Sequence, residues 1–236
     1  MSHYKIYIFI TALLCSSGLL QAQEQDKQRG IQFSCMLWDG PLTEKIYYRD
    51  GDTFNHVVPF TGSRSLPHIL EKSKEFALYV ENKEAKEKEL PYKLVGKAAL
   101  LPGVKQILFI LFLKQTEGEL EIRILALDDS LNGFPAGTFR FANFSKSDLL
   151  VKFAGATKKI PSREMTIMKS GVKKEGGVIP FLIGNEQGKK IFETRLFAQL
   201  NGREIVFIGP PKKEGGLPSV RFLPQLLPQK LPEIPQ

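Results

Sequence analysis

Alternation of apolar and charged side chains with a period of two constrains the fold of this chain more than any other feature. The clearest case is Glu119–Ile124, in which the apolar side chains share one face and the charged ones share the other. Successive side chains of a β-strand point to opposite faces of a sheet, so this segment predicts a half-buried strand. The same period recurs at 139–141 and 149–153, and the unbroken apolar run at 107–113 predicts a buried strand.

The dipeptide Asn201-Gly202 predicts a hairpin near the end of the chain. It lies between apolar segments at 192–200 and 203–208, and Asn-Gly tolerates the positive backbone angles of a type I′ turn. Pairing outward from this turn places Ala198 opposite Ile205 on a surface that faces the core.

Two further dipeptides predict connections between neighbouring strands. Asp50-Gly51 predicts a hairpin in which Tyr47 lies opposite Phe54. Glu117-Gly118 predicts the connection between strands at 106–113 and 119–127.

Helix signals are few. Residues 81–89 are almost all charged and have no apolar face, which favours a solvated loop. Residues 66–74 follow a possible cap at Ser65 and carry Pro67 in the first turn, so they could form one short helix. The sequence as a whole predicts an all-β fold.

A weak internal repeat indicates how the strands are grouped. Ile31–Trp38, followed by a strand and Gly51, resembles Thr138–Ser145, followed by a strand and Gly155. The repeat predicts two tandem β-sandwiches over 31–130 and 134–209, and such sandwiches usually have about 100 residues; one continuous sandwich is the alternative. The tail at 210–236 has seven prolines in 27 residues and is expected to be extended, largely as polyproline II.

The first residues predict export. A short positive region, an apolar stretch of 15 residues and a small residue at Ala22 are typical of a signal peptide over 1–22. We expect cleavage after Ala22, with Gly18 as the second choice, and a flexible lead at 23–30. Lipidation at Cys15 is disfavoured because Leu14 is large, and no later apolar run is long enough to predict a transmembrane helix.

Charge is distributed unevenly along the chain. Residues 23–133 carry 15 Lys and Arg against 17 Asp and Glu, whereas residues 134–236 carry 17 against 8. A basic second half suggests an anionic partner, such as an acidic polysaccharide, lipid headgroups or an acidic protein surface; nucleic acid is disfavoured by export. The candidate anion-binding residues are the lysine doublets Lys158, Lys159, Lys173, Lys174, Lys189 and Lys190. Alternatively, such doublets only keep hairpin ends solvated.

Residues capable of catalysis or metal binding do not form a recognisable pattern. His56 and His68 lack a second ligand at metal-like spacing. Asp128 and Asp129 are adjacent on a strand end, which points their carboxylates to opposite faces, and we interpret both as turn residues. Cys35 alternates with apolar neighbours and is expected to be buried. The sequence therefore predicts no catalytic, cofactor-binding or metal-binding residue.

The segment from Ala126 to Ser130 and on through Phe134–Ser145 resembles a group of exported bacterial β-sandwich proteins. The resembling block covers about 20 residues, with weaker similarity up to Pro210. It implies an immunoglobulin-like or transthyretin-like antiparallel sandwich located in the cell envelope. It transfers no catalytic residue to this chain.

Three functional hypotheses follow. The leading one is a non-enzymatic envelope or secreted protein, periplasmic or extracellular, that binds a protein or an anionic partner through its basic second half. The second is a structural or assembly component that uses the Pro-rich tail at 210–236. The third, a hydrolase, has no constellation of residues to support it.

Overall fold

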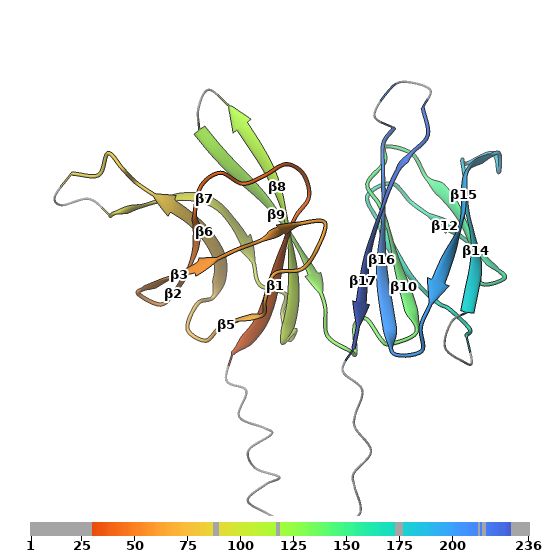
Figure 1. The fold of residues 1–236 in the computed structure, drawn as a ribbon, viewed down its shortest axis with the longest axis horizontal. Helices are drawn as coiled ribbons and strands as arrows, with labels where there is room; N and C mark the ends of the chain where they lie inside the picture. Colours follow the sequence, from red (N-terminus) through yellow and green to blue (C-terminus); the bar gives the residue numbers. More distant parts are fainter. Residues whose placement is uncertain are drawn as a thin grey trace, which may run out of the picture.

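The computed structural model describes residues 30–86, 90–116, 119–172, 177–211, 213 and 216–227. Within these residues every regular element is a β-strand, and the strands form four sheets (Figure 1). The all-β prediction is therefore confirmed. In the same part of the chain, no helix is long and apolar enough to span a membrane.

The first two sheets face each other and form what we call sandwich 1. Sheet A has the order β4, β1, β8, β9, with β5 also paired with β1, and sheet B has the order β3, β2, β6, β7. The strands are β1 (Ile31–Leu37), β2 (Ile46–Asp50), β3 (Thr53–Val57), β4 (Phe60–Thr61), β5 (His68–Leu70), β6 (Glu75–Glu81), β7 (Tyr92–Ala99), β8 (Gln106–Thr116) and β9 (Glu119–Asp128).

The other two sheets form sandwich 2. Sheet C has the order β13, β10, β16, β17, and sheet D has the order β12, β11, β14, β15. The strands are β10 (Thr138–Asn143), β11 (Leu149–Phe153), β12 (Ala156–Ile160), β13 (Met165–Lys169), β14 (Gly177–Gly184), β15 (Lys190–Ala198), β16 (Gly202–Gly209) and β17 (Ser219–Leu226).

The strand order of sandwich 1 recurs in sandwich 2. Strands β1 and β8 pair in parallel, as do β10 and β16, and the remaining strands follow in the same order around them. Trp38 and Phe144 are equivalent, because their backbone N–H groups donate to the carbonyls of Leu111 and Ile208 at the same place in the two sheets. The repeated strand order supports the internal duplication. It aligns Trp38 with Phe144, one residue before Ser145, which the repeat in the sequence had placed opposite Trp38.

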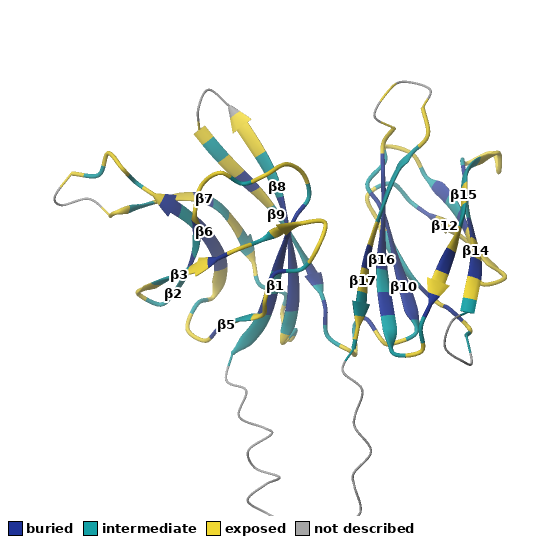
Figure 2. Cartoon of the chain, in the orientation of Figure 1, coloured by how far each residue is buried: buried dark blue, intermediate teal, exposed yellow. Residues whose placement is uncertain are grey.

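Three apolar layers separate the four sheets. One fills sandwich 1 and another fills sandwich 2, while the third joins sheet A to sheet C. Buried residues are concentrated on strands that border these layers, such as β10 and β16 (Figure 2). Sheets A and C are thus covered on both faces, which explains the unbroken apolar run of β8, since a doubly covered strand has no solvent-facing side. It also corrects the expectation of a half-exposed β10: Arg140 is only 6% exposed.

Aromatic and aliphatic side chains hold the two sandwiches together. The ring of Trp38 from the end of sheet A packs edge-on against Phe207 of β16 at 5.2 Å between centroids. The guanidinium of Arg221 on β17 lies over the Trp38 ring, 4.5 Å from the ring centroid, and donates to the Trp38 carbonyl oxygen. The chain is therefore one continuous stack of four sheets, in the order B, A, C, D (Figure 1).

The hairpin predicted at Asn201-Gly202 is wrong. Strand β15 pairs with β14 in sheet D, whereas β16 pairs with β10 and β17 in sheet C. The dipeptide instead carries the chain from one sheet to the other across the end of sandwich 2. Local turn rules identify a tight reversal, but in a sandwich the two strands that follow can belong to opposite sheets.

The predicted hairpin at Asp50-Gly51 exists with a different register. Asp50 pairs with Thr53 and Tyr47 pairs with His56, so the turn residues are Gly51 and Asp52. Gly51 has a φ of +63°, a conformation in which glycine avoids the steric cost of a side chain. Asp50 remains in the strand because its carboxylate accepts backbone N–H groups from three consecutive residues, 71–73.

Two other local predictions are wrong. Residues 68–70 of the suggested helix form β5, which pairs with the edge of β1. Residues 219–226 of the predicted extended tail form β17, which pairs with β16 along its full length and buries Leu223 between the sandwiches. Residues 212, 214, 215 and 228–236 of that tail, together with residues 1–29, lie outside the described residues. The pairing of β8 with β9 is as predicted.

Candidate functional site

The predicted lysines lie at the edges and turns of sheet D. Lys158 and Lys159 are on β12, while Lys189 and Lys190 lie where the chain enters β15. All four are exposed. Lys173 and Lys174 fall outside the described residues. Because β12 and β15 are the two outer strands of sheet D, the predicted doublets lie at opposite edges of one sheet.

Strand register places two more cations on the same outward surface. Lys152 of β11 alternates with core residues, and Arg195 of β15 precedes the buried Leu196. Both side chains therefore point away from the core of sandwich 2. We call Lys152, Lys159, Lys190 and Arg195 the basic face. Arg195 stands outside the lysine doublets and was therefore not predicted; the charged residues at 193 and 195, which alternate with the residues that face the core, are the signal that would have found it.

Acidic neighbours partly neutralise the edges of the basic face. Lys159 Nζ lies 2.8 Å from Asp148 Oδ2, and this contact raises the pKa of Lys159 and lowers that of Asp148. Lys190 Nζ lies 2.7 Å from Glu193 Oε2. In the described residues, Lys152 and Arg195 have no ion-pair partner. The positive charges of Lys152, on the inner strand β11, and of Arg195, on the outer strand β15, are therefore not neutralised by an ion pair within this part of the chain.

Lys158 does not contribute to this face. It pairs with the core residue Val151 across the strands, and its Nζ reaches over the edge of sandwich 2 to the backbone carbonyl of Ile167 at 3.4 Å. The prediction had treated Lys158 and Lys159 as equivalent. Adjacent residues of a strand point to opposite faces, so only one member of such a doublet can lie on the outward surface.

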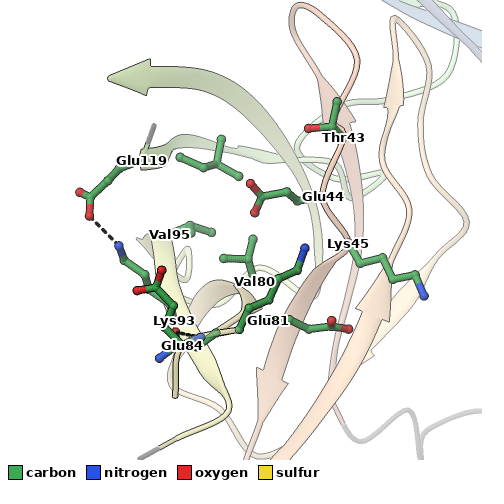
Figure 3. A pocket seen from close by; sticks show the side chains of 12 residues that line it. Thr43, Glu44, Lys45, Val80, Glu81, Glu84, Lys93, Val95 and Glu119 are labelled. Carbon is green, nitrogen blue, oxygen red and sulfur yellow. Dashed lines mark hydrogen bonds and ion pairs between the residues drawn. The ribbon is translucent and has the colours of Figure 1, made fainter. Parts of the chain in front are cut away.

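A groove of about 660 Å³ opens at one end of sandwich 1 (Figure 3). Val80 and Val95 line its apolar part, and charged side chains surround them. Glu119 and Lys93 lie side by side in the groove lining and form an ion pair with 2.7 Å between Oε1 and Nζ, and the contact lowers the pKa of Glu119. Glu119 is consequently held in its ionised form, which makes it a poor proton donor.

Four aromatic rings cover the outward face of sheet B. Phe54 stacks on Tyr92 with 4.2 Å between ring centroids, and Tyr47 and Tyr79 pack edge-on against these two rings at 5.0 Å. The Tyr47 hydroxyl donates to Glu81 at 2.7 Å, and this hydrogen bond raises the pKa of Tyr47 to about 12. The four rings pack against one another and cover the outward face of sheet B, and this packing accounts for the cluster.

Asp129 is the centre of a buried ionic cluster between the sandwiches, which corrects its interpretation as a simple turn residue. It is 2% exposed, and its carboxylate lies 2.5 Å from Arg64 and 3.4 Å from Arg203. Arg203 also donates to the backbone carbonyls of residues 129, 130 and 134. The guanidinium groups of Arg140 and Arg203 both lie over the ring of Phe134. The cluster fixes the linker between the two sandwiches.

Asp128 is a turn residue, as expected, since its carboxylate accepts the Ser130 N–H at 2.9 Å.

Cys35 is fully buried in β1, and burial raises the pKa of its thiol. His68 stacks on Phe33 at 5.3 Å, and burial, with a smaller contribution from His56, lowers its pKa. Within the described residues, His, Cys, Asp and Glu form no group of three that could hold a metal ion.

No protein-family model matches the chain, and no curated protein is significantly similar to it.

Proposed function

We propose that this chain is an exported, non-enzymatic protein of the cell envelope or the secreted fraction, which binds an anionic polymer on its basic face. The observation that carries the proposal is the placement of Lys152, Lys159, Lys190 and Arg195 on one outward sheet surface. Two of these cations have no ion-pair partner among the described residues. Unneutralised cations on a flat surface are the footprint of an anionic partner.

The spacing of the cations favours a polymer over a single small anion. Lys159 and Arg195 lie on the two outer strands of sheet D, three strand spacings apart. At about 4.8 Å per spacing, the face is roughly 14 Å wide. A small anion is held by donors that converge on one point, whereas these cations point outward from separate strands. An extended chain with repeated negative groups, such as an acidic polysaccharide, could contact several of them at once.

The sandwich 1 groove gives no support to the hydrolase hypothesis, because of how its charges are arranged. Glu119 and Lys93 neutralise each other there, and the pKa of Glu119 is lowered. A general acid requires the opposite shift. Export rests on residues 1–22, which lie outside the described residues. The assignment of both sandwiches as immunoglobulin-like or transthyretin-like is supported by their size and by their two facing sheets.

The assembly hypothesis is narrowed by β17. Residues 219–226 of the Pro-rich tail belong to sheet C, so they could not be removed without damage to the body. Only residues 228–236 remain as a proposed docking peptide.

Retention on immobilised dextran sulfate tests the proposal. The variant K152E/K159E/K190E/R195E removes the basic face, and K72E/K74E/K97E/K105E makes the same change in net charge at exposed lysines of sandwich 1. We expect the first variant to lose retention at low salt and the second to be retained close to wild type. Equal loss in both variants, or no loss in the first, would contradict binding at this face.

A further inference from the structure

A second groove, of about 550 Å³, lies in sandwich 2 beside the core. Edge strands β15 and β17 form its sides, and β16 forms its floor. Its apolar walls come from Phe139, Phe197, Pro224 and Leu226. Grooves of this size and composition are typical of sites for small organic groups.

Glu204 of β16 projects into this groove from the core side of its strand. Its cross-strand neighbours are Phe139 on β10 and Pro224 on β17, neither of which carries a charge. Burial is the one cause of the rise in its pKa to about 7, so no charged side chain among the described residues offsets it. The adjacent Arg203 points to the opposite face, toward Phe134 and the linker. An unpaired carboxylate on an apolar surface is costly to keep.

The duplicated fold shows what this position otherwise contains. Ile107 of β8 is the counterpart of Glu204, because each lies four residues before the carbonyl that accepts the N–H of Trp38 or Phe144. Ile107 is fully buried in the core of sandwich 1. There β7 and β9 close the edge of the sandwich, and Gly96 lies so close to Ile122 that a Cβ would be 2.3 Å from its carbonyl oxygen. In sandwich 2 the equivalent strands β15 and β17 border the groove instead.

We propose that the Glu204 groove is a binding site for an alkylammonium group carried on an apolar body. The carboxylate would accept charge-assisted hydrogen bonds from the ammonium, and Phe139, Pro224 and Leu226 would contact the apolar part. The site is independent of the basic face, which lies on the outward surface of sheet D and attracts the opposite charge.

A cation is the ligand that the groove selects. A neutral apolar ligand would leave the carboxylate desolvated and unpaired, and an anion would be repelled by it. An ammonium neutralises Glu204 and gains more at this partly desolvated carboxylate than it would at a fully exposed one. The apolar walls then distinguish an organic amine from a hydrated inorganic cation.

Calorimetric titration with phenethylammonium at pH 8 tests this site. Phenethyl alcohol serves as the neutral analogue. Nα-acetyl-lysine methylamide is titrated to test whether the groove binds a lysine side chain. The variant E204Q removes the charge, and E193Q removes an exposed glutamate of β15 as the matched control.

We expect phenethylammonium to bind at least about tenfold more tightly than phenethyl alcohol, and to lose about that factor in E204Q but not in E193Q. Binding of the lysine derivative with the same dependence on Glu204 would identify a protein side chain as the source of the ammonium. No binding of either amine, equal binding of amine and alcohol, or equal affinity in E204Q would overturn the assignment. Binding of dextran sulfate is measured in a separate experiment, so a failure to bind it would not contradict the proposed Glu204 site.

Discussion

Replacing Glu204 with Gln should stabilise the protein at pH 8 and leave its stability nearly unchanged at pH 4.5. Burial raises the pKa of Glu204 from 4.5 to about 7 in the folded protein. Between these values the folded state retains a proton that the unfolded state has lost, so the free energy of unfolding falls as the pH rises. Below about pH 4.5 the carboxyl is protonated in both states, and above about pH 7 the decrease in the free energy of unfolding is complete.

The size of the effect follows from the same two values. A rise from 4.5 to about 7 corresponds to at most ~3 kcal/mol, at ~1.4 kcal/mol for each tenfold change in proton affinity. The groove is open to water, which screens part of this penalty. We therefore expect E204Q to gain about 1–2 kcal/mol over wild type at pH 8.

Urea unfolding of both proteins at pH 4.5, 6 and 8 measures the difference. E193Q is the control, because Lys190 lowers the pKa of Glu193 and its removal should bring no gain at pH 8. A difference between wild type and E204Q that is the same at all three pH values would refute the reasoning, since the penalty would then not come from ionisation of Glu204.

Other parts of the structure give three further predictions. D129N should lower the free energy of unfolding by about 3–5 kcal/mol in urea titration, because it leaves Arg64 and Arg203 without their buried partner; a loss below 1 kcal/mol would contradict this. Truncation after residue 218 should abolish cooperative unfolding, since β17 and Leu223 are lost, whereas truncation after residue 227 should leave Tm unchanged. The Cys35 thiol should react with a disulfide reagent only in denaturant; labelling of the native protein would argue against its burial.

The strands were the most predictable part of this molecule. The alternation in Glu119–Ile124 predicts β9, and Ile122 is indeed in the core while charged residues flank it outside. Cys35 is buried for the reason given by its neighbours. These features depend on side chains within one strand, and a period of two is sufficient to read them.

Features that depend on distant parts of the chain were not predictable. Asn201-Gly202 has the composition of a hairpin turn, but the partner of β16 is decided by packing against β10 and β17. Asp129 follows a strand as a turn residue would, and only the fold brings Arg64 and Arg203 to it.

The candidate sites were predictable to different degrees. Lys159 and Lys190 of the basic face were identified from their doublets, whereas Arg195 lies outside any doublet and was missed; the register of β15 places it on the same face. Glu204 stands next to Arg203 and before the apolar run of β16, so its sequence resembles a charged strand end. Its position beside an apolar groove becomes visible only when β15 and β17 are placed around it.

The salt dependence of dextran sulfate binding tests the central claim most directly. For a polyanion, the slope of log affinity against log salt concentration reports how many charges the protein neutralises. We expect wild type and K72E/K74E/K97E/K105E to share one slope. K152E/K159E/K190E/R195E should bind weakly, with a slope whose magnitude is smaller by about 3. The same slope and affinity in all three proteins would contradict the assignment of the basic face as the binding surface.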